Sequence, residues 1–148
     1  MRRLRRTWIV AWTAACVAVC VVAGAAWTTN AAAAGHYLFD AIKAPAYLRS
    51  LKTVLAGARE LPEWTRNLTL EKGDYVGSPG ESVAVEGARY ETFFACKAHA
   101  CDTDQFEVMF APNGAQAWAA IRVDGGALMF LGAPNPAMQA ALRPAFTH

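Results

Sequence analysis

The sequence predicts an α+β fold: an antiparallel sheet of about five short strands, with an N-terminal helix and a short C-terminal helix. Three observations predict it. A helical apolar pattern comes first in the folded part of the chain. Period-2 alternation with closely spaced turn signals then occupies residues 82–131, and a second helical pattern follows near residue 136. Strands that follow one another, instead of alternating with helices, favour an antiparallel sheet with helices packed beside it.

Residues 1–34 are typical of an export signal. Arg2, Arg3, Arg5 and Arg6 are followed by the apolar run Trp8–Ala26, and four alanines precede Gly35. A signal peptide has three parts: a positively charged N-terminal region, an apolar stretch, and small residues before the cleavage site. We therefore expect a signal peptide over 1–34, a mature domain over 35–148 and a periplasmic location. The apolar run also leaves open an uncleaved anchor, because its length approaches that of a membrane span.

The charge balance changes once the signal is set aside. The whole chain carries a formal net charge of +2, but residues 35–148 hold ten basic and twelve acidic side chains. A mildly acidic domain argues against a nucleic-acid partner, since phosphate binding requires a basic patch. We expect no nucleic-acid partner and, after cleavage, no membrane association.

The first helix is predicted over Tyr37–Ala58. Leu48, Leu51 and Val54 follow the spacing of one apolar helix face. Pro45 suits the first turn of this helix, where its missing N–H costs nothing. Gly57 lies where a helix end is expected.

The segment Leu61-Pro62-Glu63-Trp64 breaks this helix, and we expect Trp64 to anchor the core, because buried aromatic rings dominate small cores. Residues 73–80 are rich in glycine, proline and serine and are predicted to form turns. The expected strands are 82–85, 89–95, 106–110, 117–123 and 127–131. Turns are predicted at Pro112-Asn113-Gly114 and Asp124-Gly125-Gly126. The last helix is predicted to begin at Pro136 and to end before Arg143-Pro144.

Four cysteines divide into two pairs by position. Cys16 and Cys20 lie in the export signal, so only Cys96 and Cys101 remain after cleavage. An exported protein meets an oxidising compartment, where these two thiols can pair only with each other unless a bond to another chain forms. Such a bond would close a small ring, with His99 on its outer side, and would fix the shape of the loop before a partner arrives.

Other chemistry at this loop stays open on the residues alone. A Cys/His pair could form a thiol nucleophile, although no base and orienting group can be named beside it. Cys96, His99 and Cys101, with Asp102 or Asp104, could bind zinc, but thiolate ligation competes with the disulfide. A redox role is less consistent with four residues between the cysteines. We expect no enzyme activity, no metal and no cofactor, and an exported metal-binding protein remains an alternative.

The sequence Cys96-Lys97-Ala98-His99-Ala100-Cys101 resembles the signature loop Cys-Lys-x-His-x-Cys of the Ivy family, the periplasmic inhibitors of C-type lysozyme. Leu61-Pro62-Glu63-Trp64 is similar to that family's Leu-Pro-x-Trp segment. The resemblance extends from about Leu51 to Phe130. The variable positions of the family's loop often hold proline and aspartate, whereas this chain has Ala98 and Ala100.

The resemblance implies a function by insertion. The loop would enter the active-site cleft of lysozyme, His99 would meet the catalytic carboxyl groups, Cys96 and Cys101 would clamp the loop, and Lys97 would make a flanking contact. The implied partner is C-type lysozyme. The alternative partner is one of the bacterium's own lytic transglycosylases, which also act on peptidoglycan through an acidic residue. The family also allows for a homodimer.

Overall fold

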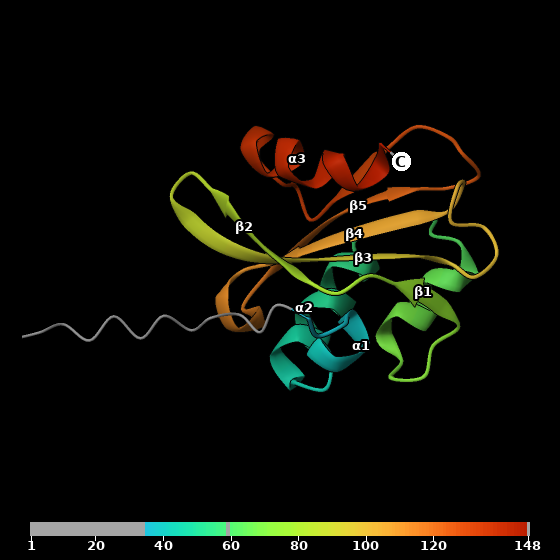
Figure 1. Cartoon of the computed structure of the whole chain (residues 1–148), viewed down its shortest axis with the longest axis horizontal. Helices are drawn as coiled ribbons and strands as arrows, with labels where there is room; N and C mark the ends of the chain where they lie inside the picture. The colour runs from blue at the N-terminus through green and yellow to red at the C-terminus, as the bar shows by residue number, and fades with distance from the viewer. Residues whose placement is uncertain (1–34, 59, 148) are drawn as a thin grey trace, which may run out of the picture.

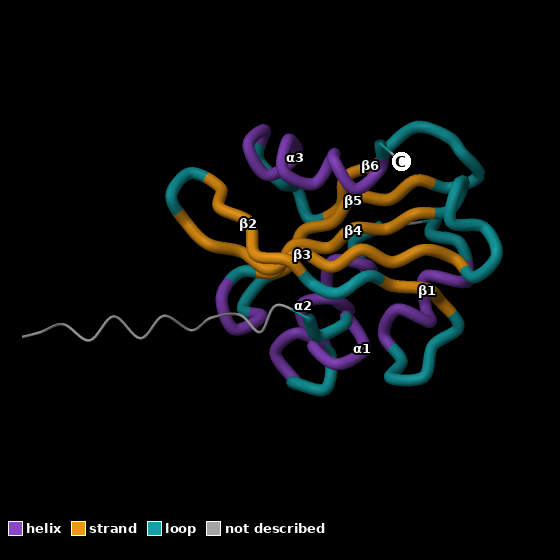
Figure 2. Tube along the Cα trace, in the orientation of Figure 1, coloured by secondary structure: helices purple, strands orange, loops and turns teal. Residues whose placement is uncertain are grey.

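The computed structural model of the protein describes residues 35–58 and 60–147. A central antiparallel sheet has helices on both of its faces (Figures 1 and 2). The helices are α1 (Leu38–Ala41), α2 (Pro45–Ala56), α3 (Pro136–Leu142) and the short 3-10 turns η1 (Glu63–Thr69), η2 (Pro112–Gly114) and η3 (Arg143–Phe146). The strands are β1 (Tyr75–Gly77), β2 (Glu81–Val85), β3 (Ala88–Lys97), β4 (Gln105–Phe110), β5 (Ala117–Arg122) and β6 (Met129–Leu131). The predicted α+β class is confirmed.

Strand β3 organises the sheet. The strand order is β1-β3-β4-β5-β6, and β2 also pairs with β3. Pairing with β2 runs from Ala88 to Thr92, and pairing with β1 runs from Ala95 to Lys97, so two short strands share one edge of β3. On its other edge, β3 pairs with β4 from Glu91 to Cys96. The β3–β4 hairpin thus forms the middle of the sheet and ends in the loop that holds both cysteines.

Each face of the sheet supports its own core. The face toward α2 buries an apolar set from the sheet and the first helices, which includes Leu51, Val54, Phe93, Phe106, Val108 and Ile121. The opposite face packs Met109 and Ala120 against the C-terminal helical segment through Met138, Leu142 and Phe146. Figure 1 shows α1 and α2 below the sheet and α3 above it. Because both faces are covered, every residue of β4 is buried.

The prediction of one helix over Tyr37–Ala58 is wrong in its first part. Pro45 begins α2 at its first helical position, as predicted, and Ala44 before it is extended, with φ −78° and ψ 124°. The proline ring disfavours helical geometry in the preceding residue, so the chain cannot continue from α1 into α2 as one helix. The expected end near Gly57 is confirmed.

Two short elements were not predicted. Residues 63–69 form η1, and residues 75–77 form β1 inside the segment predicted as turns. η1 has seven residues and β1 has three, which is too short for either to show a periodic apolar pattern. Trp64 lies in η1, is 7% exposed and packs in the main core, which confirms the prediction of a core anchor.

The two predicted hairpin turns and the last helix are confirmed in position. Asn113, Gly114, Asp124 and Gly125 all have positive φ, the conformation that asparagine, aspartate and glycine tolerate best. α3 begins at Pro136 behind Asn135, whose side chain accepts a hydrogen bond from the backbone N–H of Met138 at 2.8 Å. Among the described helices, none is long and apolar enough to span a membrane. The predicted signal segment 1–34 lies outside the described residues.

Candidate functional site

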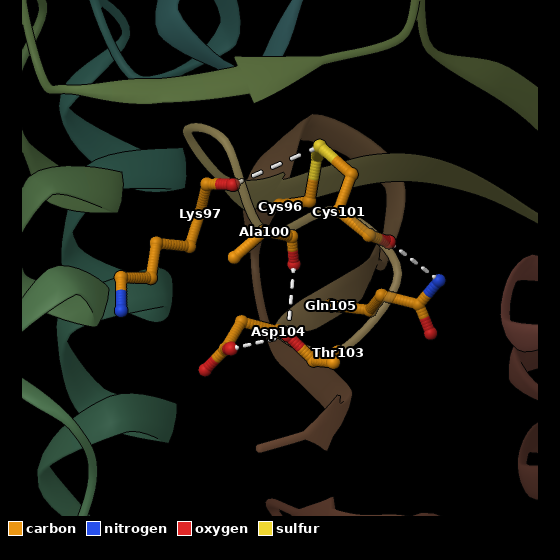
Figure 3. Close-up of a disulfide and its surroundings, with 7 residues drawn as sticks. All are labelled: Cys96, Lys97, Ala100, Cys101, Thr103, Asp104 and Gln105. Carbon is orange, nitrogen blue, oxygen red and sulfur yellow. Dashed lines mark hydrogen bonds between the residues drawn. A yellow bond between two sulfur atoms is a disulfide. The ribbon is translucent and has the colours of Figure 1, made fainter. Parts of the chain in front are cut away.

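A disulfide joins Cys96 to Cys101 and closes a ring that we call the cysteine loop (residues 96–101). Cys96 is near the end of β3, where it pairs with Gln105 of β4, and it is 1% exposed. Cys101 lies past the tip of the hairpin, with its Cα 4.9 Å from that of Cys96 (Figure 3). The predicted pairing is confirmed, and one end of the ring is embedded in the sheet.

The tip of the cysteine loop is a tight turn. The backbone N–H of Ala100 donates to the carbonyl oxygen of Lys97 at 3.0 Å. Ala98 has negative φ and His99 has a φ of +66°, the pattern of a type II turn, which favours glycine at its third position. A side chain in this left-handed region costs about 1 kcal/mol, although histidine is one of the residues found there more often than most. The turn therefore holds His99 in a strained backbone conformation, a feature often found at functional positions.

His99 and Lys97 are the exposed residues of the cysteine loop, while Ala98 and Ala100 are half-buried. Within the described part of the chain, the imidazole of His99 forms no hydrogen bond, ion pair or ring contact. The side chain of Lys97 extends away from the disulfide in Figure 3. The ring thus presents one imidazole and one ammonium group to solvent, flanked by methyl groups.

A second turn, formed by residues 100–104, follows the tip and stabilises the ring through hydrogen bonds. The backbone N–H groups of Asp104 and Thr103 donate to the carbonyl oxygen of Ala100 at 2.8 Å and 3.2 Å. The hydroxyl of Thr103 donates to Asp104 Oδ2 at 2.8 Å, and Asp104 is only 3% exposed. The backbone N–H of Lys97 donates to the carbonyl oxygen of Asp104 at 3.0 Å and closes the base of the hairpin.

Two further hydrogen bonds connect the cysteine loop to β4 and the turn after it to the turn between β5 and β6. Gln105 Nε2 donates to the carbonyl oxygen of Cys101 at 2.9 Å, and the N–H of Gly125 donates to the carbonyl oxygen of Thr103 at 3.0 Å. Arg122 of β5 donates in turn to Gln105 Oε1 at 3.1 Å, so the amide orientation is fixed from the neighbouring strand, where Arg122 is paired with Gln105. Sequence reasoning missed these supporting residues. The only available signal was a run of polar side chains directly after the second cysteine.

The disulfide bears on the alternatives that the sequence left open. It uses both sulfur atoms, so neither cysteine can act as a thiolate nucleophile or as a zinc ligand while the bond is intact. Asp104 is buried and accepts a hydrogen bond from the hydroxyl of Thr103. In residues 35–58 and 60–147, no group of three or more His, Cys, Asp or Glu side chains could hold a metal ion.

Comparison with known proteins identifies a family. The model of the family described as Inhibitor of vertebrate lysozyme (Ivy) matches residues 46–145. The matched range covers more than half of the chain and runs from α2 through η3, so it includes the whole sheet and the cysteine loop. No curated protein matches the chain.

Proposed function

This chain belongs to the Ivy family, the inhibitors of vertebrate lysozyme, and on that premise we propose that it inhibits C-type lysozyme by inserting the cysteine loop into the enzyme's active-site cleft. The observation that carries the proposal is His99. It stands exposed at the tip of a disulfide-closed turn, in a backbone conformation that the ring fixes. The inhibitor would act by occupying the cleft and would perform no chemistry of its own.

An imidazole suits a cleft with two carboxyl groups. A retaining glycosidase holds its two carboxyl groups about 5 Å apart, and one of them stays protonated near neutral pH. A neutral imidazole can donate a hydrogen bond to the ionised group and accept one from the protonated group, and no other neutral side chain offers both from one planar ring. We propose that His99 bridges the two catalytic carboxyl groups in this way.

The supports of the loop fit this role. Insertion would cost less free energy if the loop were already in its bound shape. The disulfide, the turn at Lys97–Ala100 and the bond from Gln105 to Cys101 all restrict the loop in the free protein. The methyl side chains of Ala98 and Ala100 keep the loop narrow on either side of His99, so it can enter a groove.

We further propose that residues 1–34 direct the protein to the periplasm. The proposal is supported by the arginines before a long apolar run and by the small residues before Gly35. In that compartment the disulfide would form and persist. It is also where an inhibitor would protect peptidoglycan from lysozyme that enters from outside.

Two alanine variants test the proposal. We expect His99→Ala to weaken inhibition of C-type lysozyme by about 1 to 3 kcal/mol, because it would leave buried polar atoms of the cleft unpaired. Lys97→Ala should cost about 1 kcal/mol or less, since an ammonium at the rim of the cleft would be screened by water and salt. The measurement is the inhibition constant from a peptidoglycan-clearing assay with hen-type lysozyme.

The control is the fold itself. Both substitutions are at exposed positions, so circular dichroism spectra should be unchanged for the two variants. Undiminished inhibition by His99→Ala would contradict the proposed insertion. The same assay with a bacterial lytic transglycosylase as the target tests the alternative partner, since inhibition of that enzyme alone would replace lysozyme in the proposal.

A further inference from the structure

A cavity of about 750 Å³ lies on the α3 side of the sheet, next to the cysteine loop. Its lining includes Thr92 and Phe94 of β3 and Gln105 and Glu107 of β4. The C-terminal segment contributes residues such as Ala141 and Pro144, and Cys101 and the following Asp102 lie at the cysteine-loop end of the cavity. The volume is in the range of small-molecule sites, which are concave and mostly apolar with a few polar groups.

Glu107 is the unusual member of this lining. It lies in the middle of β4, is 7% exposed, and pairs with Phe94 on one side and Ala120 on the other. Its Oε2 atom has no hydrogen-bond partner among the described residues. Burial raises the pKa of its carboxyl group to about 8, a hydrogen bond with Thr92 opposes that rise, and the charge of Glu81 adds to it. A buried carboxyl oxygen without a partner costs free energy, so a donor supplied by a ligand would be stabilising there.

The charged side chains that line the cavity are all acidic. Glu81 of β2 and Asp102, directly after the cysteine loop, line it together with Glu107, and the described residues of its lining include no lysine, arginine or histidine. Two arginines that contact or adjoin lining residues in the sequence have partners of their own. Arg122 on β5 donates to Gln105 Oε1 and to the carbonyl oxygen of Phe146, and Arg143 at the start of η3 lies over the ring of Phe130.

We propose that this cavity binds an amphipathic organic cation, an ammonium or guanidinium group on a short apolar stem, with the cationic end hydrogen-bonded to Glu107. Three acidic side chains without a basic one among them favour a positive ligand. The stem would lie against apolar side chains of the lining, Phe94, Val83, Pro144 and Ala145. Binding of a free cation at this site can be measured without lysozyme, so that measurement can succeed or fail independently of the proposed function.

The test uses n-hexylammonium as the probe, with hexan-1-ol and hexanoate as controls of the same length. Isothermal titration at pH 9, where Glu107 is ionised and the amine is still largely protonated, should give about tenfold tighter binding of hexylammonium than of hexanol. At pH 7 the affinity for hexylammonium should be about tenfold lower than at pH 9, because the carboxyl group must first lose its proton. Hexanoate should not bind.

Two variants separate the carboxyl group from the cavity. Glu107→Gln keeps the size of the side chain and should remove both the preference for hexylammonium over hexanol and the change between pH 7 and pH 9. Ala145→Phe should reduce the binding of both compounds by filling the cavity without changing Glu107. Glu63→Gln, at an exposed position outside the cavity, should bind like the unaltered protein.

Equal affinity for hexylammonium and hexanol, full binding of hexylammonium by Glu107→Gln, or no binding of either compound would each overturn the proposal. The cation could be a free amine or a basic side chain of a protein partner, which share this chemistry. Saturating hexylammonium should leave lysozyme inhibition unchanged if the ligand is a free amine, and should weaken it if the cavity takes a side chain of the bound enzyme. Failure of the His99→Ala prediction would affect neither measurement.

Discussion

At the scale of single residues, His99 combines the side chain proposed to enter the cleft with an unfavourable backbone conformation. Its φ of +66° is the third-position geometry of a turn that glycine would adopt without strain. The hexapeptide pattern placed His99 at the centre of the loop, but it gave no value for φ. A backbone angle of this kind depends on the closed ring and on the hydrogen bond from Ala100 to Lys97, neither of which a sequence pattern specifies.

His99→Gly is therefore expected to raise the free energy of unfolding by about 1 kcal/mol or slightly less, while it removes inhibition. The glycine relieves the strained φ, and the greater freedom of the unfolded glycine offsets part of the gain. Urea unfolding and the clearing assay measure the two effects. His99→Asn is the matched control, because asparagine also tolerates positive φ but lacks the imidazole. A loss of stability in His99→Gly would show that His99 is not strained.

At the scale of elements, the β3–β4 hairpin could be predicted and its surroundings could not. Alternating residues 106–110 and the turn signals gave these strands to within a few residues. The same alternation does not reveal that both faces are covered. β4 has Phe106, Val108 and Phe110 toward α2, yet Glu107 on the other face is buried too, because the C-terminal segment lies over it. The short elements η1 and β1 carried no periodic signal at all.

The disulfide is expected to act on the loop more than on the hairpin. Cys96→Ala with Cys101→Ala should lower the free energy of unfolding by about 2 kcal/mol, the chain-entropy contribution of so short a ring. Pairing from Glu91 to Cys96 and the bond between Lys97 and Asp104 do not require the disulfide, so the sheet should form. Inhibition should weaken, since the loop would have to be ordered on binding.

Circular dichroism and the clearing assay check that expectation. Alanine is preferable to serine at position 96, because a hydroxyl group there would be buried in the sheet. Chemical reduction of the unaltered protein should have the same effect as the double variant. Inhibition by the double variant equal to that of the unaltered protein would show that the ring does not pre-order the loop.

At the scale of the whole molecule, the helical layers on the two faces of the sheet determine which side chains are buried. This layering could not be predicted, because helix positions along the chain do not say which face of the sheet each helix covers. The cavity beside Glu107 and its raised pKa are consequences of that arrangement, and they could not be predicted. The loop could be predicted because all six of its residues are adjacent in sequence.

The pKa of Glu107 predicts the pH dependence of stability. A carboxyl group raised from 4.5 to about 8 keeps its proton in the folded protein while the unfolded chain releases it. The stability contribution is complete below pH 4.5 and is lost as pH rises through about 8, at up to about 1.4 kcal/mol per pH unit. The free energy of unfolding of Glu107→Gln, relative to that of the unaltered protein, should therefore be higher at pH 8 than at pH 5.

Urea unfolding of both proteins at pH 5, 6.5 and 8 measures this difference. The comparison isolates Glu107, since all other titrating groups are present in both proteins. Glu63→Gln should keep the slope of the unaltered protein, because Glu63 is exposed. Parallel curves for Glu107→Gln and the unaltered protein would show that Glu107 titrates normally.

The attachment of the cysteine loop to the sheet also means that the amino acids within the loop could be exchanged. The ends of the loop are held by the disulfide and by the pairing of Cys96 with Gln105 in the sheet. The residues of both cores lie outside positions 97–100. The four residues from Lys97 to Ala100 could be replaced without altering either core, provided that position 99 receives a residue that accepts positive φ. If the loop binds the target as proposed, the same fold would present different short cyclic peptides, and the side chains at these four positions would select the target.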